Sequence, residues 1–264
     1  MTPPADATQA TPVSVAVEAG VATVLVDRPP VNAMGRAVLA GLEAAAQRIA
    51  ADSEVRAVIV TGGGERAFMA GADISEFEAL EAEEGAMEAH SRWARSVLDG
   101  WAVLPQPVIA AVQADAVGGG LEFALLADLI VADPRARFGL PEVRLGLIPG
   151  GGGTQRLPRR VGAGIAKEML LLGSVIDADR ALAIGLLNRV SAEGEVLAEA
   201  RRLADRLAAL PRIAVQAAKA ATAEDLAGAL DAERAQFLIA FASDDFREGF
   251  RAFLERREPR FTHR

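Results

Sequence analysis

Three short apolar runs recur in the first half of the chain, and a loop follows each of them. They are VRAVIV (residues 55–60), PVIAAV (residues 107–112) and DLIVAD (residues 128–133). Short runs rich in Val and Ile, bounded by Gly or Pro, are typical of buried strands. The repeat has no fixed period, so it predicts strand–turn–helix units rather than a solenoid. Because aromatic residues make up only 5% of the 264 residues, the core must be built from Ala, Val, Leu and Ile.

The character of the sequence changes along the chain. Residues 1–12 are rich in Pro, Thr and Ala and predict a mobile tail. The next fifteen residues alternate in polarity about Ala19-Gly20 and predict a β-hairpin. From about Ile165 onward the apolar spacing is helical almost throughout. We therefore expect an α/β core over residues 13–195 and a separate helical region over residues 196–264.

Charge and cysteine content narrow the function classes. The formal net charge is −8, whereas a nucleic-acid-binding face needs clustered positive charge. There is no cysteine, so disulfides, thiol nucleophiles and thiolate metal sites are excluded. The first residues carry no basic segment followed by an apolar one, and no apolar run is long enough to span a membrane. A cytoplasmic location is the expectation.

Two glycine-containing turns are the candidate binding elements. Gly118-Gly119-Gly120 lies between a predicted strand and a predicted helix, which leaves free N–H groups at a helix N-terminus. Such groups suit a phosphate or the oxyanion that develops on a carbonyl, although tight packing of helix on strand explains the triplet equally well. The spacing matches neither known nucleotide-binding glycine motif. The loop Ala70–Asp73 also follows a strand, and on its own it is read as an ordinary turn.

Two carboxylates accompany these turns. Glu122 falls in the first turn of the helix after the glycine triplet, where a negative charge is stabilised by the helix dipole. Glu142 follows Pro141 in a loop. Separately each has a structural explanation, but together, beside a candidate oxyanion hole, they fit paired general acid–base catalysis.

Other polar and aromatic residues are weaker candidates. His90 and His263 are expected to be solvated, and no His–Asp–Ser arrangement or metal-ligand spacing is present. Asp73 and Asp128 lie beside turns, where short carboxylates usually cap or hydrogen-bond the backbone. A phenylalanine stripe on the last predicted helices is typical of a core or a subunit interface rather than a ligand site: Phe237, Phe241, Phe246, Phe250 and Phe253.

Several segments taken together resemble the enoyl-CoA hydratase/isomerase (crotonase) family. They are ERAFMAGADISEF, the stretch from QPVIAAV to PRRVG that contains GGGLE, FGLPE and IPGGGGTQRL, and the tail DDFREGFRAFLERREPRF. The resemblance covers almost everything after the first dozen residues. It implies an α/β fold, a spiral of ββα units with a C-terminal helical trimerisation region, and assembly into homotrimers or dimers of trimers.

The resemblance also implies the substrate and the site. It implies an acyl-CoA thioester substrate, no metal, and no cofactor beyond the coenzyme A of that substrate. The N–H groups of Ala70 and Gly119 match the family's oxyanion hole, Glu122 matches the carboxylate that activates water, and Glu142 matches the carboxylate that supplies a proton. The remaining substrate- and CoA-binding positions are Arg28, Ala33, Phe68, Ala72, Asp73, Ile74, Gly118, Pro141 and Gly150.

The implied reaction is reversible syn addition of water to a trans-2-enoyl-CoA, a step of fatty acid β-oxidation. The main alternative is a Δ3-Δ2 enoyl-CoA isomerase, which can work with one carboxylate, and acyl-CoA decarboxylases or other lyases of the family stay open. A non-catalytic or RNA-binding member is disfavoured by the net charge and the retained glutamate pair. Two departures from the family pattern bear on the pocket: Met69 is bulkier than the usual residue, and Asp115 replaces a Gly or apolar residue.

Overall fold

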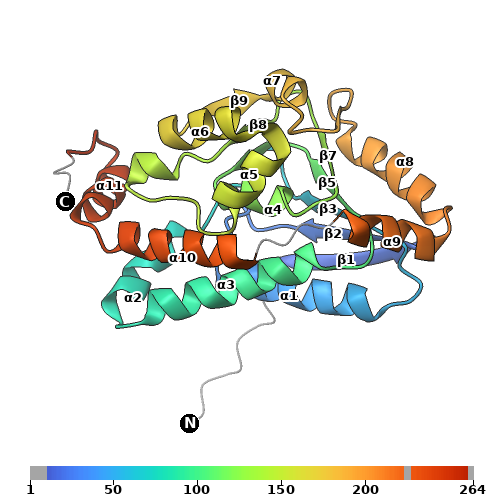
Figure 1. Cartoon of the computed structure of the whole chain (residues 1–264), viewed down its shortest axis with the longest axis horizontal. Helices are drawn as coiled ribbons and strands as arrows, with labels where there is room; N and C mark the ends of the chain where they lie inside the picture. Colours follow the sequence, from blue (N-terminus) through green and yellow to red (C-terminus); the bar gives the residue numbers. More distant parts are fainter. Residues whose placement is uncertain (1–10, 223–226, 261–264) are drawn as a thin grey trace, which may run out of the picture.

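The computed structural model describes residues 11–222 and 227–260. Two sheets form its centre (Figure 1). The large sheet has the order β1-β2-β3-β5-β7-β10, and the small sheet has the order β4-β6-β8-β9. The strands of the large sheet are β1 (Val13–Glu18), β2 (Val21–Val26), β3 (Ala57–Gly62), β5 (Val108–Val112), β7 (Leu129–Ala132) and β10 (Arg189–Val190); those of the small sheet are β4 (Ala67–Met69), β6 (Asp115–Val117), β8 (Arg137–Gly139) and β9 (Val175–Asp177).

Consecutive strands alternate between the two sheets, which gives the chain its spiral. After the antiparallel β1–β2 hairpin, β3, β5 and β7 join the large sheet in parallel, while β4, β6 and β8 join the small sheet in parallel. Helices connect each pair of strands to the next pair. The fold is therefore the expected α/β spiral of ββα units.

Both faces of the large sheet are covered, which explains why its central strands are apolar throughout. Val58 and Val60 of β3 face the main core, which α1 (Arg36–Ala51) also enters. Ala57 and Ile59 face the other way and pack against α8 (Val196–Ala208). The helix that opens the predicted helical region thus covers the core sheet, and the division at residues 195/196 stays a prediction.

The remaining helices complete the layers. They are α2 (Phe77–Ala82), α3 (Ala86–Ala102), α4 (Gly119–Ala124), α5 (Gly153–Val161), α6 (Ala163–Leu172), α7 (Ala178–Ala183), α9 (Arg212–Ala221), α10 (Ala227–Phe241) and α11 (Asp244–Glu255), with 3₁₀ turns at Ile74–Glu76 and Glu142–Leu145. In Figure 1, α10 runs beside α3 and beneath α5, and α11 lies at the end of the molecule next to the second 3₁₀ turn. Of the C-terminal helices, α10 therefore packs on α3 and α5, whereas α8 covers the large sheet.

Two expectations need correction, and a third lies almost wholly outside the described residues. The region after Ile165 is not wholly helical, because β9 adds an antiparallel edge to the small sheet and β10 a parallel edge to the large one. The sequence also missed α5, which begins within the glycine-rich run and contains Pro158. The expected mobile tail falls almost wholly on residues 1–10, which lie outside the described residues; Pro12 accepts a hydrogen bond from the Asp27 N–H.

Gly120 sets the distance between α4 and β4. A Cβ atom at this position would lie 1.8 Å from the Met69 carbonyl oxygen, a backbone atom that cannot rotate away. Gly120 therefore allows the helix to lie directly on the end of the strand, and this contact brings the two candidate binding turns together.

Substituting alanine for Gly120 is expected to disrupt the fold, because the added methyl group meets backbone. We expect Gly120→Ala to lower the free energy of unfolding by more than about 3 kcal/mol, as overpacking of a rigid site does. Gly100→Ala is the matched control, since Gly100 lies in α3 with no atom within 4 Å of the added Cβ. We expect Gly100→Ala to raise the free energy of unfolding by about 0.5–1 kcal/mol, because alanine favours a helix more than glycine does. Urea unfolding of both variants measures the difference, and equal stabilities would contradict this explanation.

Candidate active site

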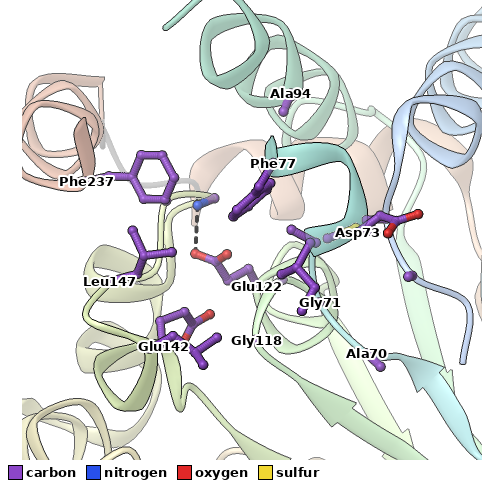
Figure 2. Close-up of a pocket in the computed structure, with 18 of the residues that line it drawn as sticks. Ala70, Gly71, Asp73, Phe77, Ala94, Gly118, Glu122, Glu142, Leu147 and Phe237 are labelled. Carbon is purple, nitrogen blue, oxygen red and sulfur yellow. Dashed lines mark hydrogen bonds between the residues drawn. The ribbon is translucent and has the colours of Figure 1, made fainter. Parts of the chain in front are cut away.

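One large cavity lies between α3, the turns after β4 and β6, the segment that follows β8, and the helices α10 and α11. Its volume is about 670 Å³, within the range of ligand sites, and its walls are mostly apolar. Figure 2 shows Glu122 and Glu142 directed into it, with Phe77 and Phe237 on one side and the turn at Gly71 on the other. The predicted site residues that line it are Ala33, Ala70, Ala72, Asp73, Ile74, Gly118, Gly119, Glu122, Pro141, Glu142 and Gly150.

Two predicted binding residues are not in the wall of this cavity. Phe68 is fully buried in the main core, and its carbonyl oxygen accepts a hydrogen bond from Asn32 Nδ2. Arg28 stands behind the wall, where it forms an ion pair of 2.6 Å with Asp73 and donates to the Ala33 carbonyl oxygen. Asp73 also caps the following 3₁₀ turn by accepting from the Ser75 N–H. Arg28 therefore positions the Ala70–Asp73 loop.

The two backbone turns meet as the sequence predicted, but through a different residue. The Ala70 N–H donates to the Val31 carbonyl oxygen at 3.1 Å, so it is not available to a ligand, and its assignment to the oxyanion hole is wrong. Among the described residues no acceptor pairs with the Ala72 N–H. A Cβ atom placed on Gly119 would lie 3.5 Å from the Ala72 nitrogen, so the two residues are neighbours.

Gly119 supplies the second donor because of its place in α4. It is the first residue of the helix, where backbone N–H groups have no intrahelical acceptor. The preceding Gly118 adopts φ +57°, which turns the chain from β6 into the helix, and its own N–H donates to the Gly139 carbonyl oxygen. The N–H groups of Ala72 and Gly119 thus form a pair of donors suited to a developing oxyanion.

Glu122 is held by the glycine run that precedes α5. Its side chain is 5% exposed, and its Oε1 atom accepts from the N–H groups of Gly151 and Gly153, both at 2.8 Å. Burial raises the pKa of Glu122 well above its usual range; the nearby carboxylates of Glu233 and Glu142 raise it further, against the two N–H donors. Both donors bind one oxygen, which leaves Oε2 to bind a water molecule.

Glu142 has a different environment. It follows β8 and opens a 3₁₀ turn, and a Cβ atom on Gly118 would lie 3.1 Å from its Oε1 atom. Its Oε2 atom is buried and has no hydrogen-bond partner among the described residues. Burial raises the pKa of Glu142 to about 7, and the charge of Glu233 adds to this shift. A carboxyl group with a pKa near neutrality is suited to donate a proton, and Glu122 is suited to hold and activate a water.

Several residues lie elsewhere than the sequence suggested. His90 is half-buried in the pocket wall rather than solvated, and burial lowers its pKa. Met69 is buried in the main core and does not narrow the pocket. Asp115 forms an ion pair with Arg137 on the neighbouring strand β8, outside the pocket. Phe237 packs on Gly150 as part of the pocket wall, so the phenylalanine stripe serves both core and site.

Glu233 is the buried site residue that the sequence reading missed. It lies on α10, is 4% exposed, and affects the pKa of both catalytic candidates. The one available signal was its position: with Leu230, Phe237 and Phe241 it follows the spacing of a single helix face, so a charged residue stands on an apolar stripe.

Comparison with known proteins agrees with this geometry. The sequence model of the enoyl-CoA hydratase/isomerase family matches residues 16–264. A crotonyl-CoA hydratase of Syntrophomonas wolfei is 40% identical over 92% of this chain and 95% of its own length. A short-chain-enoyl-CoA hydratase of Clostridium acetobutylicum is 40% identical over 91% and 94%. The crystal structure of carnitinyl-CoA hydratase from Mycobacterium avium has a TM-score of 0.86 at 35% identity, covering 97% of this chain and all of that one.

The raised pKa of Glu142 predicts a pH-dependent loss of stability. Between its usual pKa and about 7, the folded chain holds a proton that the unfolded chain has released, so the free energy of unfolding falls as pH rises through this window. Glu142→Gln should remove this component and, at pH 8, should be more stable than the wild type by on the order of 2 kcal/mol. Urea unfolding at pH 5 and pH 8 measures the change in the free energy of unfolding, and Glu168→Gln at an exposed position is the control. An unchanged pH slope in Glu142→Gln would contradict the assignment.

Proposed function

The chain belongs to the enoyl-CoA hydratase/isomerase family, and from that premise we propose that its pocket catalyses the reversible syn addition of water to a trans-2-enoyl-CoA, giving a 3-hydroxyacyl-CoA. One observation supports hydration most directly. Glu122 and Glu142, two buried carboxyl groups in different environments, face one cavity that also presents two backbone N–H donors.

The proposed mechanism assigns one role to each group. The N–H groups of Ala72 and Gly119 bind the thioester oxygen, on which enolate charge develops as water adds. Glu122 accepts a proton from the water as its oxygen bonds to C3, and Glu142 donates a proton to C2. The number of protons on the pair is restored when Glu142 regains the proton that Glu122 received, so the cycle needs no other reagent.

A short acyl group is the first substrate to test. The relatives that share 40% identity are named for crotonyl-CoA and short-chain enoyl-CoA, and we extend that class to this chain as a proposal. The apolar walls around Phe77 and Phe237 fit a hydrocarbon chain beside the carboxyl pair. A role in fatty acid β-oxidation and a cytoplasmic location belong to the same proposal; no described helix has the length and hydropathy to cross a membrane.

The alternative within the family is a Δ3-Δ2 enoyl-CoA isomerase. That reaction moves a proton between carbons and needs no bound water, so a single carboxyl group suffices. The Oε2 atom of Glu122, left without a backbone donor, favours hydration because it is placed to bind water. The two activities are separated by offering the protein a 2-enoyl and a 3-enoyl thioester in parallel.

Neutralising either carboxyl group tests the proposed reaction. With crotonyl-CoA, Glu122→Gln and Glu142→Gln should each lower kcat by at least about 10²-fold, the usual size of an acid–base contribution. Each change keeps the side-chain volume, and an amide oxygen at position 122 can still accept from Gly151 and Gly153. Loss of enoyl absorbance measures the rate, and Glu168→Gln should equal the wild type.

Two results would contradict the proposal. A variant at either position that keeps the wild-type kcat would exclude that carboxyl group from the chemistry. A wild type that leaves crotonyl-CoA unchanged but converts a 3-enoyl-CoA into its 2-enoyl isomer would replace hydration by isomerisation.

We also propose that the chain assembles into homotrimers or dimers of trimers. The support is a set of large apolar side chains that are exposed on the outer helices of the single chain: Leu171 (73%), Leu172 (64%), Ile213 (77%), Ile239 (65%) and Leu254 (56%). Such residues are expected to be covered by a partner surface.

Analytical ultracentrifugation tests this assembly. The proposed trimer predicts a mass three or six times the 27.5 kDa of one chain. Leu171→Glu together with Leu172→Glu should shift the mass toward that of the single chain, because burying two carboxylates in an apolar interface is unfavourable. A wild type that sediments at 27.5 kDa at micromolar concentration would contradict the proposal.

A further inference from the structure

Glu233 and Glu122 bind the same glycine loop from two sides. The Oε1 atom of Glu233 accepts from the Gly152 N–H at 2.6 Å, and its Oε2 atom accepts from the Thr154 N–H at 2.8 Å and from the Thr154 hydroxyl. Glu122 accepts from the N–H groups of Gly151 and Gly153, which alternate along the chain with those bound by Glu233. Four successive backbone donors are thus shared alternately by two carboxylates.

This arrangement couples the C-terminal helix α10 to Glu122. Glu233 lies 81 residues after Gly152, and among residues 11–222 and 227–260 no nearer acceptor pairs with the N–H groups of Gly152 and Thr154. A buried N–H that loses its acceptor destabilises the conformation that buries it. The loop from Gly151 to Thr154 therefore depends on both carboxylates for its conformation. The orientation of Glu122 depends in turn on the conformation of this loop.

The polar groups around Glu233 offset part of the effect of its burial. Burial raises the pKa of Glu233 above its usual value, whereas the Thr154 hydroxyl, the two N–H donors and the guanidinium of Arg156 stabilise its ionised form and lower the pKa. Arg156 is itself buried, donates to the Gly151 carbonyl oxygen at 3.0 Å and lies 3.6 Å from Asp99 of α3. On the same side, Arg95 of α3 pairs with Asp99 and with Asp231 of α10.

Glu122 and Glu142 complete the set of ionisable groups that face Glu233. Glu122 has two donors on one oxygen, and Glu142 has a buried oxygen with none. Of the three carboxyl groups, Glu233 has the most donors and so holds negative charge most readily. That fixed charge acts on the other two and raises the pKa of both.

We propose that Glu233 is a positioning residue for the hydration reaction: it fixes the loop that orients Glu122, and its fixed negative charge keeps a proton on the Glu122–Glu142 pair. The proposal rests on the proposed hydratase function. Glu233 is absent from the residues that line the cavity, so it acts through its neighbours and not on the substrate itself.

Two substitutions separate the charge of Glu233 from its loop contacts. Glu233→Gln removes the charge and keeps the volume, whereas Glu233→Asp keeps the charge and shortens the reach to the loop. Both should lower kcat by about 10- to 100-fold, as small misplacements of a catalytic group do, with a smaller change in KM. Only Glu233→Gln should move the pH profile. Without the neighbouring negative charge Glu142 loses its proton more readily, so the fall in kcat at high pH should begin about one pH unit lower.

A readout that needs no activity keeps this test apart from the proposed function. The side-chain carboxyl ¹³C signal of Glu142, assigned by its loss in Glu142→Gln, is titrated in the ligand-free protein. Its midpoint should fall in Glu233→Gln and stay at the wild-type value in Glu233→Asp. If the wild type fails to hydrate crotonyl-CoA, the proposed reaction fails, and the titration still decides whether Glu233 controls the proton on Glu142.

Thr154→Val provides a second route if the Glu233 variants do not fold. It removes one hydrogen bond to Glu233 and keeps all three carboxylates. A fall in kcat of a few-fold with an unchanged pH profile supports the loop contact, and Glu168→Gln on the exposed face of α6 is the control. An unchanged kcat in Thr154→Val or in Glu233→Gln overturns the positioning role. An unmoved Glu142 titration in Glu233→Gln overturns the role of the charge.

Discussion

The site depends on the burial of carboxyl groups, which lose most of their contact with bulk water. Backbone N–H groups supply hydrogen bonds that water would otherwise donate. An isolated buried carboxylate is strongly disfavoured, so it must either be hydrogen-bonded or take up a proton. Here burial raises the pKa of both groups: Glu122 is hydrogen-bonded by the glycine loop, and Glu142, which keeps one oxygen without a partner among the described residues, has a pKa of about 7. Two side chains of the same kind are thus held in two different environments, as the proposed base and acid roles require.

The donors that face these carboxyl groups come from packing of backbone on backbone. Gly120 lets α4 lie directly against the carbonyl at the end of β4, which brings the first N–H of the helix beside the Ala72 N–H. In the proposed mechanism the thioester oxygen of the substrate is then held by main-chain atoms, which substitution of side chains cannot remove. Phe77 and Phe237, which belong to one aromatic cluster with Phe241, line the cavity, so one helix, α10, contributes both part of the apolar wall and Glu233.

The parts predicted from sequence are those that depend on local pattern or on the family motifs. The apolar runs predicted β3, β5 and β7, and the glycine triplet predicted the N-terminus of α4 beside Glu122. Ala72 was missed as a donor because the difference from Ala70 is one tertiary hydrogen bond, from the Ala70 N–H to Val31. Glu233 was also missed because its role depends on tertiary hydrogen bonds: its partners lie 79 and 81 residues earlier in the chain. The edge strands β9 and β10 are too short for periodicity to detect.

Whether the carboxyl pair and the N–H pair converge on one thioester can be measured in a crystal structure with bound 3-hydroxybutyryl-CoA. We expect the thioester oxygen at about 3 Å from both the Ala72 and the Gly119 nitrogen, with the 3-hydroxyl group between the carboxyl groups of Glu122 and Glu142. A thioester oxygen that contacts neither nitrogen, or a hydroxyl group remote from both glutamates, would contradict this expectation.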